Sequence, residues 1–389
     1  MEEEYLADVT DVIAERVEFL KEYLSNPMAY IRQVMTLRDT NDLMDGSQDL
    51  SNIVDVLKDL EFQLTDLDNA RDFHSMGGWP LLVALLTDSI HGLEYELQQA
   101  ITQEAEIATK MKHNATNKDV ASGENLSIQL SDDTKKFLAR YQQMVWEVQG
   151  LACWAIGTAV KNVDEFHSWA LDDFSDLVKQ ASVDDGGEVN VLSILIDKLH
   201  SESSNSPSIL NLSPVDDSLQ MRRKYEMYAL GSLLRGNRDA IHFFGRYDGP
   251  AVVYKMFNFL TSGGNNLAAL DPTTVKLVSK IILLADDLVM DVTLNKSDKD
   301  STDDRDKHVL SSLTTFEWCI APLRMMNYPS IHIQQKMIES MIHMAPYCSF
   351  NMDKSYLLND VSSAISSAGF TIEDDDELSR LFQKLDEIL

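Results

Sequence analysis

Apolar residues recur at three- and four-residue spacing along most of this chain, which is the period of an α-helix and not that of a β-strand. A first helical region covers residues 5–38, and a second stripe begins near Leu50. The stripe consists of Leu50, Ile53, Leu57, Leu60, Leu64 and Leu67. A stripe of this kind covers one face of a helix and packs against a core. The pattern therefore predicts an all-α chain.

The first stripe begins a succession of one long, one short and one medium helix. Asp68-Asn69 can cap the short helix, Gly77-Gly78 ends it, and Pro80 begins the next helix at a first-turn position. The same order is predicted twice more. The second set has a long helix after Lys135 that ends near Lys161 and a helix through Phe174 and Leu177; the third has Met221–Leu234, Ala240–Phe244 and a helix after Asp248-Gly249-Pro250.

The repeat is visible in residues as well as in period. The segment Asn69 to His74 is echoed by Asn162 to His167 and, more loosely, by Asn237 to His242. These recurrences are about 93 and 75 residues apart, which exceeds an armadillo unit of ~40 to 47 residues. Polar insertions at 110–133, 201–217 and 294–307 account for much of the excess, because each lacks the apolar residues that offset the entropy of ordering.

These observations predict an armadillo-like α-solenoid, a superhelical stack of helical repeats. The expected organisation is an N-terminal helical region over 1–49, a repeat domain over 50–350 and an acidic C-terminal helical segment over 351–389. A stack of such units exposes one face of every long helix on a concave surface, which is a device for binding a partner.

The charge narrows the choice of partner. The chain has 33 Lys and Arg against 63 Asp and Glu, a formal charge of −30. This charge repels nucleic acid and anionic lipid headgroups and favours partners with basic faces. The start of the chain is too acidic for a signal peptide, and no apolar run approaches the ~20 residues that span a bilayer. We expect no binding of nucleic acid, no membrane insertion, and a monomer.

The sequence lacks the common catalytic signatures. It has no phosphate-binding glycine loop with Lys-Ser/Thr, no Gly-x-Ser-x-Gly and no His-Glu-x-x-His. His74 and His167 recur with the repeat, which favours capping or packing over metal binding. The acidic stretch Asp298 to Asp306 lacks the glycine and closing glutamate of a calcium loop and is interpreted as a solvated insertion. We expect no enzyme activity, no cofactor and no metal.

Cysteines and sequons bear on the cellular compartment. Cys153, Cys319 and Cys348 are widely spaced and are interpreted as buried free thiols, without a disulfide framework or zinc-ligand spacing. Four N-glycosylation sequons lie in or beside the predicted insertions, and they favour a lumenal protein. Their acceptors are Asn114, Asn125, Asn211 and Asn295.

Several segments resemble a known family. Asp68-Asn69-Ala70 followed by Gly77-Gly78 is similar to the opening armadillo repeat of the nucleotide exchange factors that serve heat-shock-70-type chaperones. Tyr228 to Arg235 resembles a later repeat, and Gln149 to Gly157 fits the repeat between them. The resemblance covers roughly residues 50–350. Among the family's branches, the chain looks most like the endoplasmic-reticulum branch that acts on BiP.

The resemblance implies a co-chaperone that embraces one lobe of the nucleotide-binding domain, opens the cleft and releases ADP. In the repeat pattern, the aromatic residue before Ala-Ile or Ala-Leu and the small polar residue four positions later face the concavity. The candidate contacts are Trp154, Thr158, Tyr228 and Ser232, with Arg235 beyond. The alternative interpretation of Trp154 and Tyr228 is that they belong to the core between repeats. The alternatives are a cytosolic exchange factor of the same family and a generic armadillo scaffold that binds an extended peptide.

Overall fold

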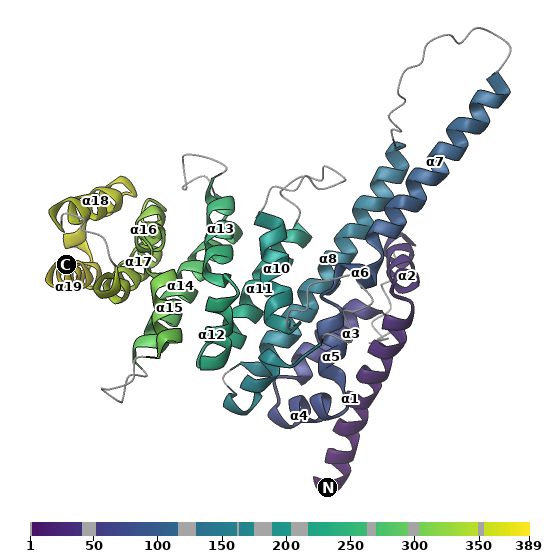
Figure 1. Ribbon diagram of the computed structural model, residues 1–389, viewed down its shortest axis with the longest axis horizontal. Coiled ribbons are helices and arrows are strands. Elements are labelled where there is room, and N and C mark those ends of the chain that lie inside the picture. Colours follow the sequence, from purple (N-terminus) through teal and green to yellow (C-terminus); the bar gives the residue numbers. More distant parts are fainter. Residues whose placement is uncertain are drawn as a thin grey trace. The chain divides into compact units, whose positions relative to one another are not determined.

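The computed structural model describes residues 2–40, 52–115, 130–161, 163–174, 189–203, 217–262, 270–294, 303–348 and 354–389. Within these ranges every regular element is a helix, which confirms the predicted all-α class (Figure 1). The described residues divide into two compact units. Unit 1 contains the chain up to Ala159 together with Asp217–Tyr225, and unit 2 contains Val160–Phe174, residues 189–203 and the chain from Glu226 onward.

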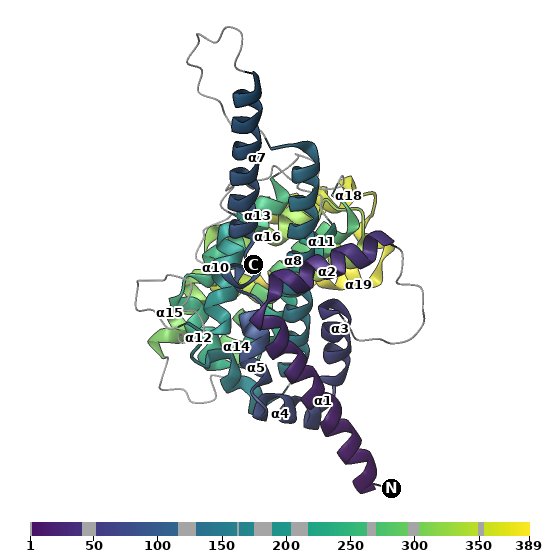
Figure 2. The ribbon, with the colours of Figure 1, turned by 90° about the vertical axis from the view of Figure 1, so that its right-hand side faces the viewer.

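Unit 1 is built around its first long helix. The elements are α1 (Glu2–Ser25), α2 (Pro27–Thr40), α3 (Ile53–Gln63), α4 (Leu67–Ser75), α5 (Gly78–Ala84), α6 (Asp88–His91), α7 (Leu93–Ala115), α8 (Asp132–Val160) to Ala159, and the start of α11 (Asp217–Leu234). Helix α1 packs along α3, α4 and α5, as both ribbon views show (Figures 1 and 2). Tyr23 of α1, Leu57 of α3 and Trp79 of α5 are fully buried in this core.

Helix α7 was not predicted, and it includes part of a segment that was expected to be an insertion. Residues 110–115 continue α7, and Asp132 and Asp133 begin α8, so the predicted insertion 110–133 is wrong at both edges. Its middle, 116–129, lies outside the described residues. The hydroxyl of Thr134 on α8 donates to a carboxylate oxygen of Glu104 on α7 at 2.8 Å. Helix α7 was missed because polar residues, seven of its 23 being Glu or Gln, separate its apolar positions.

Unit 2 contains the remaining elements. They are η2 (Asp164–Leu171), α10 (Val191–Ser203), the rest of α11, α12 (Arg238–Arg246), α13 (Gly249–Thr261), α14 (Pro272–Leu294), α15 (Asp304–Leu313), α16 (Phe316–Met325), α17 (Ile331–Met344), η5 (Ala345–Tyr347), α18 (Lys354–Ser367), η6 (Ile372–Asp374) and α19 (Asp376–Ile388). Helix α13 packs on α10, α17 on α14, and α19 on α17.

The third predicted set of helices is confirmed as α11, α12 and α13. The second set needs correction, because Phe174 lies outside any helix and Leu177 lies outside the described residues. The predicted insertion 201–217 also overlaps helix: residues 201–203 end α10, Asp217 begins α11, and 204–216 lie outside the described residues. Helix α10 was not predicted, although Leu192, Leu195 and Leu199 follow the helical period and are fully buried.

The predicted insertion 294–307 is also corrected at its edges. Leu294 ends α14, residues 295–302 lie outside the described residues, and Asp303 caps α15 by accepting from the amide of Arg305 at 3.0 Å. Asp306 is only 6% exposed and is held by Arg238 at 2.5 Å and by the imidazole of His242 at 2.6 Å. The end of this acidic stretch therefore belongs to the core of unit 2 and is not a solvated loop.

The same helix junction occurs in both units. In unit 1 a left-handed residue, Gly77 at φ 78°, precedes Gly78, and a Cβ on Gly78 would lie 2.3 Å from the ring of Phe73. In unit 2 the left-handed residue is Asp248 at φ 59°. The glycine that follows it, Gly249, would carry a Cβ 2.2 Å from the ring of Phe244. A buried Phe of the short helix thus lies directly against the first residue of the next helix in each unit.

A disulfide overturns the prediction of three free thiols. Cys319 of α16 and Cys348, just after η5, are joined with their Cα atoms 6.2 Å apart. Helix α17 runs between them and turns the chain back, which brings together two residues that are 29 apart in sequence. Cys153 is buried outside the disulfide, as predicted.

Candidate partner-binding surfaces

In unit 1 the candidate contacts lie on the last turns of α8. Trp154 and Thr158 are four residues apart, so they share one face of the helix. The Trp154 ring stacks on that of Tyr225, with centroids 4.8 Å apart and planes 7° apart. The Thr158 hydroxyl donates to a carboxylate oxygen of Glu61, at the end of α3, at 2.9 Å. Both Trp154 and Thr158 keep part of their surface exposed.

Glu61 supplies the negative charge among the residues around Thr158. Its carboxylate is half-buried, and no ion pair ties it to a cation among the residues that the structure describes. Burial, and then the charge of Glu61, raise the pKa of the Tyr225 hydroxyl, which keeps that hydroxyl neutral and able to donate. The group formed by Glu61, Trp154, Thr158 and Tyr225 is called the Trp154 cluster below.

In unit 2 the candidate contacts lie on the second half of α11. Tyr228 is partly exposed, and the ammonium of Lys161 lies 5.7 Å from the centre of its ring. Ser232 is only 7% exposed, so its side chain offers a partner little surface.

Arg235 is exposed but held by α14. Its guanidinium pairs with Asp287 at 2.6 Å, and the next main-chain amide, that of Gly236, donates to Asp291 at 3.0 Å. The side chain also lies over Gly231, where a Cβ would be 2.6 Å from a guanidinium nitrogen. Because Arg235 and Asp287 are both nearly half exposed, the pair contributes at most about 1 kcal/mol to stability. The pair holds the guanidinium of Arg235 in one orientation.

The structure adds residues that the sequence analysis missed. Glu61 and Tyr225 join Trp154 and Thr158, whereas Asp287 and Asp291 join Arg235. Asp287 and Asp291 are four apart on α14, a spacing that places two carboxylates on one helix face and could have been noticed. Nothing in the sequence pairs Glu61 with Thr158.

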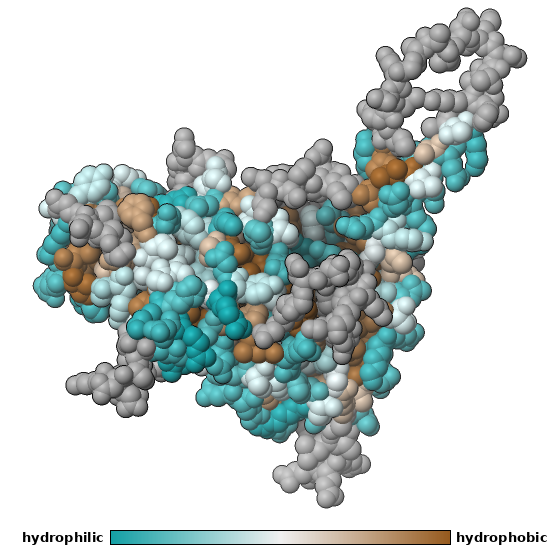
Figure 3. Space-filling view, viewed as in Figure 1, coloured by the Kyte–Doolittle hydropathy of each residue, from teal (hydrophilic) through white to brown (hydrophobic). Residues whose placement is uncertain are grey.

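The viewed surface carries no broad apolar area. Hydrophilic residues cover most of the face drawn in Figure 3, and hydrophobic residues are gathered in small separate areas.

Two histidines of the repeat, His167 and His242, make contacts within unit 2. The main-chain carbonyl of His167 accepts from the Asn237 side chain at 2.8 Å, and Asn237 also caps α12. His242 is fixed by Asp306. Among the described residues, no group of three or more His, Cys, Asp or Glu side chains could hold a metal ion. Asn114 lies within α7, and Asn125, Asn211 and Asn295 lie outside the described residues.

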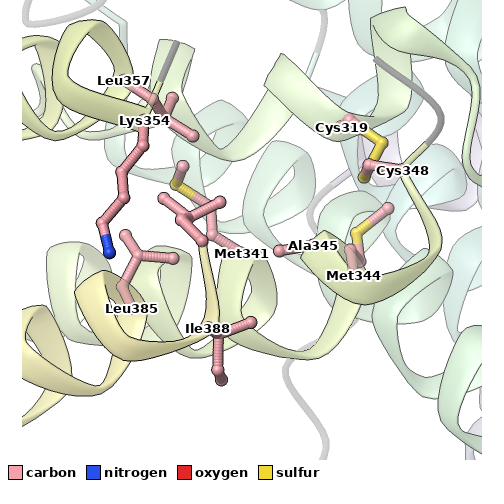
Figure 4. Close-up of a pocket in the computed structure, with 10 residues that line it drawn as sticks. Cys319, Met341, Met344, Ala345, Cys348, Lys354, Leu357, Leu385 and Ile388 are labelled. Carbon is pink, nitrogen blue, oxygen red and sulfur yellow. A yellow bond between two sulfur atoms is a disulfide. The ribbon is translucent and has the colours of Figure 1, made fainter. Parts of the chain in front are cut away.

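A small cavity of about 150 Å³ lies near the C-terminus of unit 2. Met341 and Met344 of α17, the two cysteines of the disulfide, and Leu385 and Ile388 of α19 are among the residues that line it (Figure 4). Lys354 lies at its edge and pairs with the carboxylate of Asp386 at 3.1 Å. The cavity is a gap between α17 and α19 in the hydrophobic packing.

We expect the stability of unit 2 to depend on pH because of one half-buried ion pair. The hydrogen bond between His343 and Asp286, 3.1 Å long, raises the pKa of the imidazole, and burial raises that of the Asp286 carboxyl. Because the folded pKa of His343 exceeds the unfolded one of ~6.5, its stabilisation is complete below that value. It is lost as the pH rises through the folded pKa. The raised pKa of Asp286 acts in the same direction at lower pH.

We expect the variant His343→Gln to abolish the loss of thermal stability that the wild type shows above pH 6.5. NMR titration of the imidazole protons gives the pKa of His343 directly. His332, exposed on the same helix, supplies the matched control His332→Gln, which should leave the pH profile unchanged. A His343 pKa at or below its ordinary value would contradict the prediction.

Comparison with models of protein families, with curated proteins and with solved structures gives no match to this chain. Among the helices that the structure describes, none is long and apolar enough to cross a membrane.

Proposed function

We propose that this chain is an armadillo-like solenoid that acts as an adenyl-nucleotide exchange factor for a BiP-type heat-shock-70 chaperone. One observation carries the proposal: the pattern aromatic-Ala-aliphatic-Gly-Ser/Thr occurs in both units, at Trp154 to Thr158 on α8 and at Tyr228 to Ser232 on α11. The aromatic residue of the pattern is partly exposed each time. These segments lie within the part of the chain that resembles the exchange factors.

The junction geometry supports the assignment to repeats. The contact between Phe73 and Gly78 in unit 1 recurs between Phe244 and Gly249 in unit 2, each after a left-handed residue. A contact that recurs in this way is what a repeated structural unit produces. The solenoid arrangement is part of the proposal.

The proposed mechanism requires differential binding and no catalytic residue. The factor binds the open, nucleotide-poor state of the chaperone better than the closed ADP state, so its binding shifts the population towards the open state and ADP leaves. By linkage, ADP must weaken the binding of the factor by the same ratio. Trp154, Thr158, Tyr228 and Arg235 are the proposed contacts, and Ser232 supports them from within the helix packing.

The endoplasmic-reticulum lumen is the proposed compartment. The disulfide between Cys319 and Cys348 supports it, because disulfides persist in oxidising compartments and are rare in the cytosol. Asn114 lies near the end of α7, and the sequon at Asn125 follows it in the sequence. Both sequons would accept glycans in the lumen. A cytosolic exchange factor of the same family is the alternative.

Release of fluorescent ADP, followed by stopped flow, tests the proposal. The chaperones are a BiP-type protein and a cytosolic relative, each measured with and without this protein. Faster release from the BiP-type chaperone supports the function and the lumen, whereas acceleration of the cytosolic chaperone alone supports the cytosolic alternative. No acceleration of either would reject the exchange activity and leave an armadillo scaffold that binds an extended peptide.

The same assay predicts the effect of removing an exposed ring. We expect Tyr228→Ala to weaken binding to the chaperone by about 1–2 kcal/mol, which lowers the exchange rate at subsaturating factor by about 5- to 30-fold. Tyr356→Ala is the matched control, since Tyr356 is an exposed tyrosine of α18 in the same unit and outside the proposed contacts. Equal rates for the two variants would remove Tyr228 from the binding surface.

A further inference from the structure

The Trp154 cluster combines two groups that bind the same kind of ligand. Trp154 is partly exposed although its ring stacks on Tyr225, and Thr158, on the same face of α8, holds the Glu61 carboxylate. An aromatic ring attracts a cation over its face, and Trp does so most strongly. A carboxylate pairs with the same cation from the side.

Two features of Glu61 indicate that its cation comes from elsewhere. The carboxylate is half-buried, which makes an uncompensated charge more costly than on the open surface. The carboxylate accepts from the neutral hydroxyl of Thr158, and its charge helps to raise the pKa of the Tyr225 phenol. By contrast, Asp59, on the same helix, is paired with Arg16 at 2.8 Å, and Glu96 in this unit is paired with Arg32. Glu61 is the acid in the cluster that a partner can neutralise.

We propose that the Trp154 cluster binds an arginine side chain of the partner protein. The planar guanidinium stacks on the exposed part of Trp154 and donates two hydrogen bonds to Glu61, a combination that the compact ammonium of lysine cannot make. The net charge of −30 fits a basic partner surface. The identification of that partner as the chaperone rests on the proposed function; the arginine site itself rests on the geometry.

The site can be tested without the chaperone. The full chain is labelled with 5-fluorotryptophan, and ¹⁹F NMR follows its five tryptophans, with Trp154→Phe to assign the signal. The probes are N-acetyl-arginine amide and N-acetyl-citrulline amide, which have the same shape but differ in charge. We expect arginine, and not citrulline, to move the Trp154 signal, and the fully buried Trp79 to stay in place.

Two variants that each remove one negative charge show whether Glu61 takes part in binding arginine. Glu61→Gln should weaken the arginine response at least about fivefold, the range of a partly desolvated pair. Asp133→Asn, which removes one charge from an exposed side chain at the start of α8, should leave it unchanged. Equal responses to arginine and citrulline, or equal affinities of wild type and Glu61→Gln, would overturn the proposal.

The chaperone assay then separates the two hypotheses. If the wild type accelerates ADP release and Glu61→Gln does so at least about fivefold less efficiently, both are supported. If the wild type accelerates release but Glu61→Gln matches it, the arginine site is not used by that partner and the inference fails while the function stands. If the wild type is inactive, the function fails and the NMR titration alone decides the arginine site.

Discussion

Removing the disulfide with the double variant Cys319→Ala/Cys348→Ala is expected to destabilise unit 2 by about 3–4 kcal/mol. The bridge closes a loop between residues 29 apart, and the entropy that this closure removes from the unfolded chain corresponds to that magnitude. It also ties α16 to the end of α17, on which α19 packs. Calorimetry should show a lower unfolding temperature for the transition that belongs to unit 2.

A reductant provides the control for this prediction. Dithiothreitol should lower the unfolding temperature of the wild type towards that of the double variant and leave the variant unchanged. Cys153→Ala deletes a buried thiol outside the bridge, so it should destabilise unit 1 without removing the effect of the reductant. A wild type that unfolds at the same temperature with and without dithiothreitol would show that the thiols are not joined.

Replacing Gly249 by alanine is expected to destabilise unit 2 by about 2–3 kcal/mol, at the upper end of overpacking effects. The added Cβ would lie 2.2 Å from the ring of Phe244, which is 1% exposed and cannot move into solvent. Either α12 or α13 must shift, and both belong to the helix set that carries Tyr228. Denaturant unfolding of the variant measures the loss.

A double-mutant cycle shows whether the clash is the cause. Phe244→Leu/Gly249→Ala should lose less stability than the sum of the two single variants, because the smaller side chain frees the space that the Cβ needs. The neighbouring change Asp248→Gly should be neutral or stabilising by up to about 1 kcal/mol, since glycine adopts the left-handed conformation without strain. Additive losses in the cycle would place the damage elsewhere.

The helices were predictable to the extent that their apolar stripes were continuous. Helices α11, α12 and α13 follow the predicted bounds closely, because an apolar stripe, an Asn cap at Asn237 and the Asp248-Gly249 stop are all local signals. Helix α7 has no comparable stripe. Helix α10 has one, at Leu192, Leu195 and Leu199, but it lies beside a polar stretch that was interpreted as an insertion, and it was missed.

The candidate site was predictable only as a set of positions on α8 and α11. The repeat pattern selected Trp154, Thr158, Tyr228, Ser232 and Arg235, and the structure leaves all but Ser232 with exposed surface. Their partners could not be predicted. Glu61 precedes Thr158 by almost a hundred residues, and Asp287 follows Arg235 on a different helix. Whether a chaperone binds this surface stays a prediction.

The sequence by itself determined the all-helical class, the positions of the helices with continuous apolar stripes, and the acidic charge of this protein, because period, caps and composition act over a few residues. Tertiary structure alone decided three features: the bridge between Cys319 and Cys348, the burial of Asp306 against His242, and the pairing of Glu61 with Thr158. Each feature joins residues that are far apart along the chain, and whether such residues meet depends on how whole helices pack.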